Sequence, residues 1–453
     1  HHLLMDQLGF PVVATSGNLG EEPICRENGE AVQRLGTIAD GLLVHDRTIV
    51  RSLDDSVMRM IEDQPLVMRH ARGFAPTVLR LQDTLPSQPL TPGPFRPVLG
   101  VGAHWKGAVA LADGELAVLG PHVGDLETAA AGEAHRASVR DLEHLYSMHP
   151  VQVACDGHPD YTSTRYAEAS GLTRVTVQHH YAHILSCLAE HRLRCTVLGV
   201  AWDGAGDGMD GTVWGGEFLR VSMSGACRVA WMRPFLLPGS DAAAREPRRA
   251  ALAVLRETFG AETYRQSAAA TIAAFSPPEL DLLESMMARG VHCPRTTSVG
   301  RLFDAVASIL GLRQVSGFEG DAAMAVEFAT EGVVQEGHFP YTLSTNLPRT
   351  RMEVDWRPTF RALLAGVMAG ESTGDLAAKF HNTLAEILVG VALSLELPRV
   401  VLTGGCFQNR RLTEAALRRL RERHLQPICH RMIPPNDGGI ALGQVVAALR
   451  EQE

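Results

Sequence analysis

Two stretches of the chain repeat one pattern of apolar and polar positions. Residues 98–111 (VLGVGAHWKGAVAL) and 197–221 (VLGVAWDGAGDGMDGTVWGGEFLRV) both open with VLGV, turn on glycines and polar residues, and resume as a second apolar run. Such a run, turn and run predicts a strand, a tight turn and a second strand. Because the two units lie about a hundred residues apart, we expect a duplicated α/β domain with a cleft between its halves.

Two later segments combine a glycine turn with a helical pattern. Residues 399–420 (RVVLTGGCFQNRRLTEAALRRL) run from a β-branched strand through Gly404 and Gly405 into an amphipathic helix. Residues 434–450 (PPNDGGIALGQVVAALR) place Asn436 and Asp437 as caps in front of a final helix. We therefore expect Asp437 at the beginning of that helix.

A proline-rich stretch divides the chain. Residues 83–97 (DTLPSQPLTPGPFRP) hold five prolines and predict a linker between folded units. Residues 1–82 predict a small α/β unit with short strands in FPVVATSGNLG and GLLVHD, and its abrupt start in an apolar helical pattern suggests part of a larger domain. Residues 98–453 are expected to form two lobes, one of about 98–196 with the C-terminal helix and one of about 197–440.

Composition and charge narrow the class of protein. At 453 residues, with 45% hydrophobic and 21% charged residues, the chain is expected to be globular with several folded units. The net charge of -9 does not indicate a basic surface for binding nucleic acid. No apolar run approaches the roughly 20 residues of a bilayer span, so we expect no membrane partner. Eight scattered cysteines without a C-x-x-C pair argue against a disulfide framework and favour the cytoplasm.

Three histidines lie within one helical turn in the stretch VQHHYAHILSCL (177–188). On a helix, His179 and His183 share one face and can present two imidazoles to one ion, while His180 and His183 form a competing pair. The alternative is that all three are ordinary hydrogen-bonded histidines at the start of a buried helix, because so short a motif is weakly specific.

Two aspartates are suitable partners for a histidine pair. Asp203 is expected to emerge at the end of the strand VLGVAWD, beside a glycine turn, and Asp437 at the start of a helix, where the dipole favours an anion. Each could instead serve only its own turn or cap. Two histidines with one or two carboxylates would suit iron, zinc or manganese and leave positions open for a substrate.

Glycine turns between strands also allow backbone amides to close on phosphate oxygens. Four such turns, at 102–107, 203–211, 404–405 and 438–439, indicate a nucleotide cleft in the duplicated frame. The sequence holds no G-x-x-x-x-G-K-[ST] motif and no G-x-G-x-x-G opening a helix, so neither a P-loop nor a dinucleotide fold is expected.

Six ordered motifs of the second unit are VQHHYAHI, VAWDGAGDGMDGTVWGGE, SVGRLFDAVASILGL, FEGDAAM, LTGGCFQNRRL and NDGGIALGQ. They resemble the TsaD-like carbamoyl and threonylcarbamoyl transferases of the actin-like ATPase superfamily (ASKHA). The first unit resembles a YrdC-like domain through PVVATSGNLGEEPI and RSLDDSVMR…LVMRHARGFAP. This order of units is that of the HypF family, the hydrogenase-maturation carbamoyltransferases, whose N-terminal acylphosphatase-like and zinc modules are not in this chain.

The resemblance implies roles for particular residues. A divalent metal, iron or zinc, would be bound by His179, His183 and Asp437, with Asp203 as a fourth ligand, and these four would be the catalytic residues. The nucleotide in the transferase unit would be bordered by Gly204, Asp304, Glu319, Gly404, Gly405 and Asn409. Nucleotide or phosphate contacts in the YrdC-like unit would come from Ser16, Asn18, Arg51, Arg69 and Arg72.

The resemblance also implies a reaction. Carbamoyl phosphate would give carbamate, which ATP with Mg²⁺ activates as carbamoyladenylate in the YrdC-like unit. In the metal-bearing cleft, the C-terminal cysteine of a HypE-type acceptor protein would then take the carbamoyl group, which later becomes a cyanide ligand. No cysteine of this chain is needed as nucleophile.

Three alternatives remain open on the sequence. An O-carbamoyltransferase acting on a small hydroxylated metabolite shares this chemistry, although its relatives carry the transferase unit first and the YrdC-like unit last. A non-catalytic nucleotide-binding module of the actin type would need no metal. A tRNA modifier is disfavoured by the acidic charge.

Overall fold

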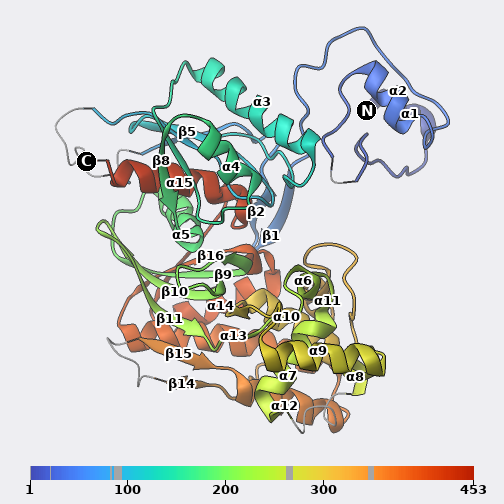
Figure 1. The fold of residues 1–453 in the computed structure, drawn as a ribbon, viewed down its shortest axis with the longest axis vertical. Helices are drawn as coiled ribbons and strands as arrows, with labels where there is room; N and C mark the ends of the chain where they lie inside the picture. The colour runs from blue at the N-terminus through green and yellow to red at the C-terminus, as the bar shows by residue number, and fades with distance from the viewer. Residues whose placement is uncertain are drawn as a thin grey trace.

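The computed structural model describes residues 2–20, 22–81, 84–85, 94–261, 269–344 and 351–452. Two sheet-containing lobes lie one above the other in Figure 1, and the N-terminal segment projects to one side of the upper lobe. Most of the linker expected at 83–97 lies outside the described residues.

The first lobe is built on a six-stranded sheet with the order β3-β6-β5-β4-β7-β8. Its strands are β3 (Thr77–Arg80), β4 (Val98–Gly100), β5 (Ala110–Ala112), β6 (Leu116–Leu119), β7 (Gln152–Asp156) and β8 (Thr173–Val177). The helices of this lobe are α3 (Ala129–Tyr146), α4 (Thr162–Ala169), α5 (His179–Glu190) and, from the end of the chain, α15 (Ile440–Arg450). Strands β4, β5 and β7 are buried throughout, as expected for a sheet covered on both faces.

The second lobe holds a nine-stranded sheet whose main path is β14-β15-β11-β10-β9-β16-β17. Its strands are β9 (Val197–Asp207), β10 (Val213–Ser222), β11 (Gly225–Met232), β12 (Phe235–Leu236), β13 (Arg295–Thr296), β14 (Thr342–Ser344), β15 (Met352–Asp355), β16 (Arg399–Thr403) and β17 (Gln426–Cys429). In Figure 1 the strands of this sheet follow one another from β16 and β9, next to the first lobe, down to β14 at the lower edge.

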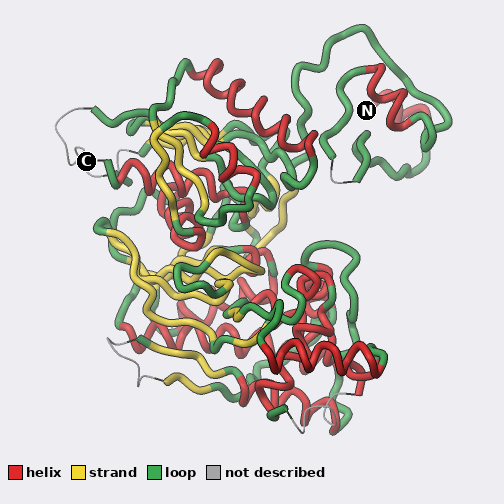
Figure 2. The backbone as a smooth tube through the Cα atoms, viewed as in Figure 1, coloured by secondary structure: helices red, strands yellow, loops and turns green. Residues whose placement is uncertain are grey.

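Most helices of the second lobe lie to the right of its strands in Figure 2. The helices of this lobe are α6 (Asp241–Arg245), α7 (Pro247–Phe259), α8 (Ala269–Ala273), α9 (Pro277–Arg289), α10 (Val299–Ile309), α11 (Asp321–Phe328), α12 (Arg357–Met368), α13 (Thr373–Leu395) and α14 (Arg410–Glu422). Two 3₁₀ turns matter for the site, η2 (Gly405–Gln408) and η3 (Asp437–Gly439).

The two sheets share one strand order. In each, three antiparallel strands are followed by two parallel ones, giving β6-β5-β4-β7-β8 in the first lobe and β11-β10-β9-β16-β17 in the second. The two VLGV strings begin the equivalent strands β4 and β9. The repeated sequence pattern therefore corresponds to a repeated sheet.

Helix α5 joins the two lobes. It packs on α15 of the first lobe and on strands β9, β10 and β16 of the second. The crossing with α15 is tight, because a Cβ at Gly443 would lie only 1.8 Å from the carbonyl oxygen of Ala182. The crossing with β9 is equally close at Gly199, where a Cβ would lie 2.2 Å from Ile184. Glycine at these two positions lets α5 approach both lobes.

The N-terminal segment has less regular structure than its sequence predicts. Its described elements are α1 (His2–Leu8), α2 (Asn28–Leu35) and a hairpin of β1 (Val57–Ile61) and β2 (Gln64–Arg69). The strands predicted in FPVVATSGNLG and GLLVHD are wrong, since these residues are irregular, and Val13 and Leu43 are fully exposed. A strand needs a hydrogen-bonded neighbour, and no described residue pairs with either segment.

The β1–β2 hairpin lies against the second lobe, although the proline-rich stretch separates them in sequence. Its turn residues Glu62 and Asp63 both have positive φ, as a two-residue hairpin turn requires. Ile61 and Leu66 are buried in the core of the second lobe. Arg59 makes a two-pronged ion pair with Glu327 on α11, with distances of 2.9 and 2.5 Å.

One described helix, α13, is long and apolar enough to cross a membrane by length and composition. The segment is not a continuous apolar run, because Asp375, Lys379 and Glu386 interrupt the apolar pattern. Because 78% of its most apolar window is buried within the protein, α13 has the burial of a core helix.

Candidate metal centre

Helix α5 begins at the histidine motif because Gln178 caps it. The Gln178 side chain accepts a hydrogen bond of 2.8 Å from the backbone N–H of Tyr181, which satisfies a donor of the first turn. His179, His180 and His183 are each at most 1% exposed. The start of a buried helix, predicted from the sequence, is confirmed.

Four side chains converge at the junction of the lobes. His179, His183, Asp203 and Asp437 each present one ligand atom, and these atoms all lie within 4.8 Å of one another. The Nε2 atom of His183 lies 3.0 Å from Oδ2 of Asp203 and 3.5 Å from Oδ1 of Asp437. The Nε2 atom of His179 lies 3.7 and 3.5 Å from the same two oxygens. Side chains from α5, β9 and η3 thus surround one point.

Asp203 reaches this point from a bulge in β9. The sequence predicts that the strand ends at Asp203, but in the structure it continues to Asp207. Asp203, Gly204 and Ala205 together face the single residue Gly215 of β10, so the ladder is interrupted there without ending the strand. The Oδ1 atom of Asp203 accepts from the backbone N–H groups of Gly204 (2.8 Å) and Gly405 (3.2 Å), which leaves Oδ2 directed at the histidines.

Asp437 is held by the turn in front of α15. It is the first residue of η3, and the side chain of the preceding Asn436 caps this turn by accepting from the N–H of Gly438 at 3.0 Å. Asp437 therefore lies at the beginning of the final helical segment, as the sequence predicts.

His179 has a second partner behind the cluster. Its Nδ1 atom lies 2.6 Å from Oδ2 of Asp156, the last residue of β7, and Asp156 is 1% exposed. A carboxylate on the far ring nitrogen fixes the tautomer and orientation of a metal-binding imidazole. Asp156 was not among the predicted site residues.

The electrostatics of the cluster are dominated by its carboxylates. Burial lowers the pKa of His179, but the charges of Asp156 and Asp437 outweigh it, and the pKa of His179 is raised well above its ordinary value. The pKa of His183 is also raised, because hydrogen bonds to Asp203 and Asp437 outweigh burial. Burial raises the pKa of Asp437, yet the imidazoles hold it at about 2. Without an ion, the carboxylates favour the protonated form of both imidazoles.

These residues fit a divalent metal. The Nε2 atom of His179 is buried, faces the centre of the cluster and has no hydrogen-bond partner among the described residues. One divalent ion that replaces two imidazolium protons leaves the net charge of this buried cluster unchanged. Two neutral imidazoles and two carboxylates are a usual donor set for iron or zinc.

His180 lies outside the cluster. Its ring packs near Trp214 at a centroid distance of 5.8 Å, and its Nδ1 lies 3.2 Å from Nε2 of Gln178. Burial and the neighbouring histidines lower its pKa well below the ordinary value. Of the two histidine pairs left open by the sequence, the structure directs His179 and His183 at the carboxylates.

Several of the predicted nucleotide residues surround Asp203. The backbone of Gly204 and Gly405 hydrogen-bonds its carboxylate, and Gly404 adopts a positive φ of 96° where a Cβ would lie 2.2 Å from the carbonyl oxygen of Trp202. Beside Gly204, the guanidinium of Arg301 pairs with Asp304 at 2.9 Å. Burial, opposed by Arg301, raises the pKa of Asp304 to about 6.

The other two predicted nucleotide residues have partners within the protein. Asn409 caps α14 by accepting from the N–H of Leu412 at 2.9 Å, and its amide lies 3.0 Å from Nε2 of His381. Glu319 is exposed and forms an ion pair with Lys106 of the first lobe. Lys106 was also missed by the sequence reasoning.

The predicted residues of the YrdC-like unit do not form a cluster like the metal centre. Asn18 bonds the carbonyl groups of Leu19 and Glu22 within its own turn, and Ser16 is exposed. Arg51 pairs with Asp141 of α3 at 2.6 Å, and Arg72 pairs with Asp55. Arg69 ends β2 and is exposed.

Family models match three segments of the chain. One described as "Carbamoyltransferase, Kae1-like Domain, second subdomain" covers residues 199–444, and "HypF Kae1-like domain" covers residues 94–190. A Sua5/YciO/YrdC model, described as "Telomere recombination", covers residues 1–71. Fold and matches together define a carbamoyltransferase-type α/β chain, in which a YrdC-like segment precedes a Kae1-like domain.

Individual relatives agree with this class. The chain is 40% identical over 466 residues to carbamoyltransferase HypF of Synechocystis, spanning 100% of this chain and 59% of the relative. It is 39% identical over 378 residues to a carbamoyltransferase HypF homolog of Cupriavidus necator, spanning 78% of this chain and 92% of that relative. The chain belongs to the HypF family of carbamoyltransferases.

A solved structure shares the fold over nearly the whole chain. The crystal structure of full-length HypF in the phosphate- and nucleotide-bound form superposes with a TM-score of 0.91 at 34% identity, covering 99% of this chain and 69% of that one. The chain thus spans only part of the length of its relatives, 59% in the case of the Synechocystis protein.

Proposed function

We propose that this chain transfers a carbamoyl group from carbamoyladenylate to the C-terminal cysteine of a HypE-type acceptor protein, within hydrogenase maturation. The observation that carries the proposal is the buried convergence of His179, His183, Asp203 and Asp437 in a chain of the HypF family. In the complete pathway, ATP with Mg²⁺ and carbamoyl phosphate would supply the adenylate.

The reaction needs an activated carbamoyl group. Carbamate is a poor electrophile, whereas in the adenylate its oxygen is bonded to phosphorus and can leave with AMP. The acceptor thiolate forms a C–S bond to the carbamoyl carbon while the C–O bond to the phosphate breaks. An iron or zinc ion bound in the cluster would supply Lewis-acid polarisation of an oxygen of the adenylate.

The chain's own residues would hold the substrate for this attack. The backbone N–H groups of Gly204 and Gly405 donate to Oδ1 of Asp203 and would keep its carboxylate directed at the ion. Asp304 would accept a ribose hydroxyl, and Arg301 beside it brings positive charge into the cleft. The burial of the four ligand residues excludes water, which would otherwise hydrolyse the adenylate.

The organisation of the chain is assigned in the same way. We assign residues 1–82 to the YrdC-like unit, where the adenylate would form, 83–97 to a linker, and 98–453 to an actin-like two-lobe transferase unit. The cytoplasm is the compartment that suits ATP and a thiol acceptor.

The test is the intact mass of a cysteine-terminated HypE-type acceptor after incubation with this protein and carbamoyladenylate. Supplying the adenylate directly makes the result independent of the activation step. The expected result is a gain of one carbamoyl group, lost with His183→Ala and kept with His180→Gln, a matched change at an equally buried histidine of the same helix. Transfer to a small alcohol instead would favour the O-carbamoyltransferase, and no transfer by metal-loaded protein would favour a binding module.

A further inference from the structure

Asn436 links the residues that support the two carboxylates of the metal centre. Its Nδ2 atom donates to Oε1 of Gln408 at 2.8 Å, and Nε2 of Gln408 donates to the carbonyl oxygen of Gly405 at 3.1 Å. Gly405 in turn donates its N–H to the carboxylate of Asp203. Asn436 itself caps the turn that begins with Asp437. One side-chain amide thus contacts the supports of both carboxylates.

The same amide reaches the YrdC-like segment. Nδ2 of Asn436 also donates to the carbonyl oxygen of Met68 on β2, at 2.9 Å. Next to this bond, the backbone N–H of Val67 donates to the carbonyl oxygen of Arg431 at 2.8 Å. The segment 431–437 that leads to Asp437 is therefore attached at two points to the β1–β2 hairpin.

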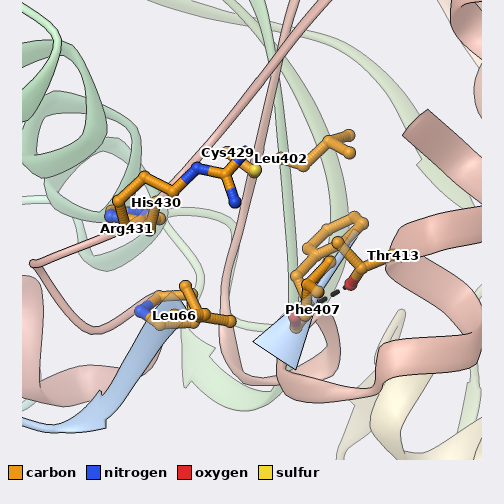
Figure 3. A pocket seen from close by; sticks show the side chains of 9 residues that line it. Leu66, Leu402, Phe407, Thr413, Cys429, His430 and Arg431 are labelled. Atoms are coloured by element: carbon orange, nitrogen blue, oxygen red, sulfur yellow. Dashed lines mark hydrogen bonds between the residues drawn. The ribbon is translucent and has the colours of Figure 1, made fainter. Parts of the chain in front are cut away.

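Apolar packing fixes the hairpin at this seam. Figure 3 shows Leu66 on β2 facing Phe407 and His430, around a small cavity that is also lined by Ile61, Leu402, Thr413, Cys429, Arg431 and Pro435. The hairpin and the loops that hold Asp203 and Asp437 thus share one buried contact. A displacement of the hairpin would move these loops with it.

We propose that Asn436 is a positioning residue that holds Asp203 and Asp437 in fixed positions relative to each other and couples the metal centre to the YrdC-like hairpin. The amide is 3% exposed, and its three hydrogen bonds use both of its donors and its acceptor. The inference rests on the metal centre of the proposed function and assigns a residue that the sequence analysis treats only as a helix cap.

Replacement by aspartate separates the two roles of Asn436. In Asn436→Asp, the carboxylate can still accept from the N–H of Gly438, so the cap is retained. It cannot donate, and its second oxygen faces the oxygens of Met68 and Gln408. A negative charge alone would tighten the binding of a cation nearby, so weaker binding has to come from lost positioning. Asn436→Ser is the neutral second variant, because serine also caps.

The measurement is a Co²⁺ titration of the full chain, followed by d–d absorption, with hydrogen exchange of residues 64–70 recorded before and after metal. We expect Co²⁺ to bind roughly 10- to 100-fold more weakly to both variants, with altered absorption bands. In the unchanged protein, bound Co²⁺ should slow exchange at Val67, and in the variants it should not.

Arg421→Ala is the control. It removes the 2.6 Å ion pair to Glu62 at the turn of the hairpin and leaves the contacts near Asp437 in place, so Co²⁺ affinity should be unchanged. Variants that bind Co²⁺ as tightly as the unchanged protein, with the same spectrum, would overturn the proposal. Hydrogen exchange of the hairpin at the same rate with and without Co²⁺ would also overturn the proposal. If Co²⁺ binding and hairpin exchange change as expected but no carbamoyl transfer is found, only the proposed function is contradicted.

Discussion

The carboxylate of Asp156 lies 2.6 Å from Nδ1 of His179, on the side of the ring opposite the candidate metal ligands. Asp156 ends β7 and His179 begins α5, so the first lobe itself orients one ligand of a centre completed by the second. This buried pair has the arrangement that tunes metal-bound imidazoles in other proteins.

Asp156→Asn should therefore weaken metal binding by roughly 10- to 100-fold without abolishing the fold, because the imidazole loses its charged partner. The affinity for Zn²⁺, measured by competition with a chromophoric chelator, checks this. Asp207→Asn is the matched control, since Asp207 is a nearby carboxylate that is not hydrogen-bonded to His179 or His183. Equal losses in both variants would contradict the role assigned to Asp156.

Metal binding should weaken as the pH falls. The carboxylates raise the pKa values of His179 and His183 in the metal-free protein, and an imidazole must be neutral to bind a metal. Each ion should displace about two protons while both histidines are protonated. Calorimetry in buffers of different ionisation enthalpy measures this number, and binding without proton release would contradict the assignment.

The same pKa shifts predict how metal-free stability depends on pH. A histidine whose pKa is raised by folding contributes stability that is complete below its unfolded value of about 6.5 and is lost as the pH rises through the folded pKa. The metal-free protein should therefore lose stability at alkaline pH, and His179→Gln should lose less. The measurement is thermal unfolding of the unchanged protein and of His179→Gln at several pH values. The same change of stability with pH in both proteins would contradict the prediction.

Asp304 should make nucleotide binding pH-dependent. Burial outweighs the charge of Arg301 and raises the Asp304 pKa to about 6, and the ionised carboxylate accepts hydrogen bonds from ribose hydroxyl groups more strongly than the protonated acid does. Affinity for AMP should increase as the pH rises through about 6. In Asp304→Asn this step should be absent. A step of the same size in that variant would remove Asp304 from the ribose site.

The crossing of α5 and α15 offers a test of packing. Gly443→Ala gains about 1 kcal/mol of helix propensity but forces a methyl group against the carbonyl oxygen of Ala182, between the two ligand histidines. Overpacking typically costs 1–3 kcal/mol or more, so we expect a net loss of unfolding free energy together with weaker metal binding.

Gly132→Ala in α3 is the control for that substitution. A Cβ there meets nothing closer than 3.8 Å, so this variant should gain about 1 kcal/mol in denaturant unfolding. Gain of stability at both positions would show that α5 and α15 do not approach as closely as described.

The sequence predicts the local elements of the site better than their assembly. The VLGV strings, the helix at His179 and the turn before Asp437 are visible because each depends on residues close together in the chain. The glycines after Asp203 suggest a turn and therefore predict a strand end at this residue. The strand continues because β10 pairs with it again beyond the bulge.

Long-range partners could not be predicted in the same way. Asp156 ends the buried strand β7, which is separated from the histidine helix by α4 and β8, and nothing local shows that it faces His179. The attachment of Met68 to Asn436 spans more than 360 residues of sequence. The predicted strands around Val13 and Leu43 fail for the related reason that strands depend on partners elsewhere in the chain.

The most direct test of the central claim measures metal content and carbamoyl transfer on the same samples. Metal-free protein is titrated with Fe²⁺ or Zn²⁺, and each sample is assayed for bound metal and for the mass gain of the acceptor cysteine. The account predicts that transfer rises with occupancy to a plateau at one ion per chain, and that His179→Ala with His183→Ala removes both. Full transfer by metal-free protein, or by the doubly substituted chain, would contradict it.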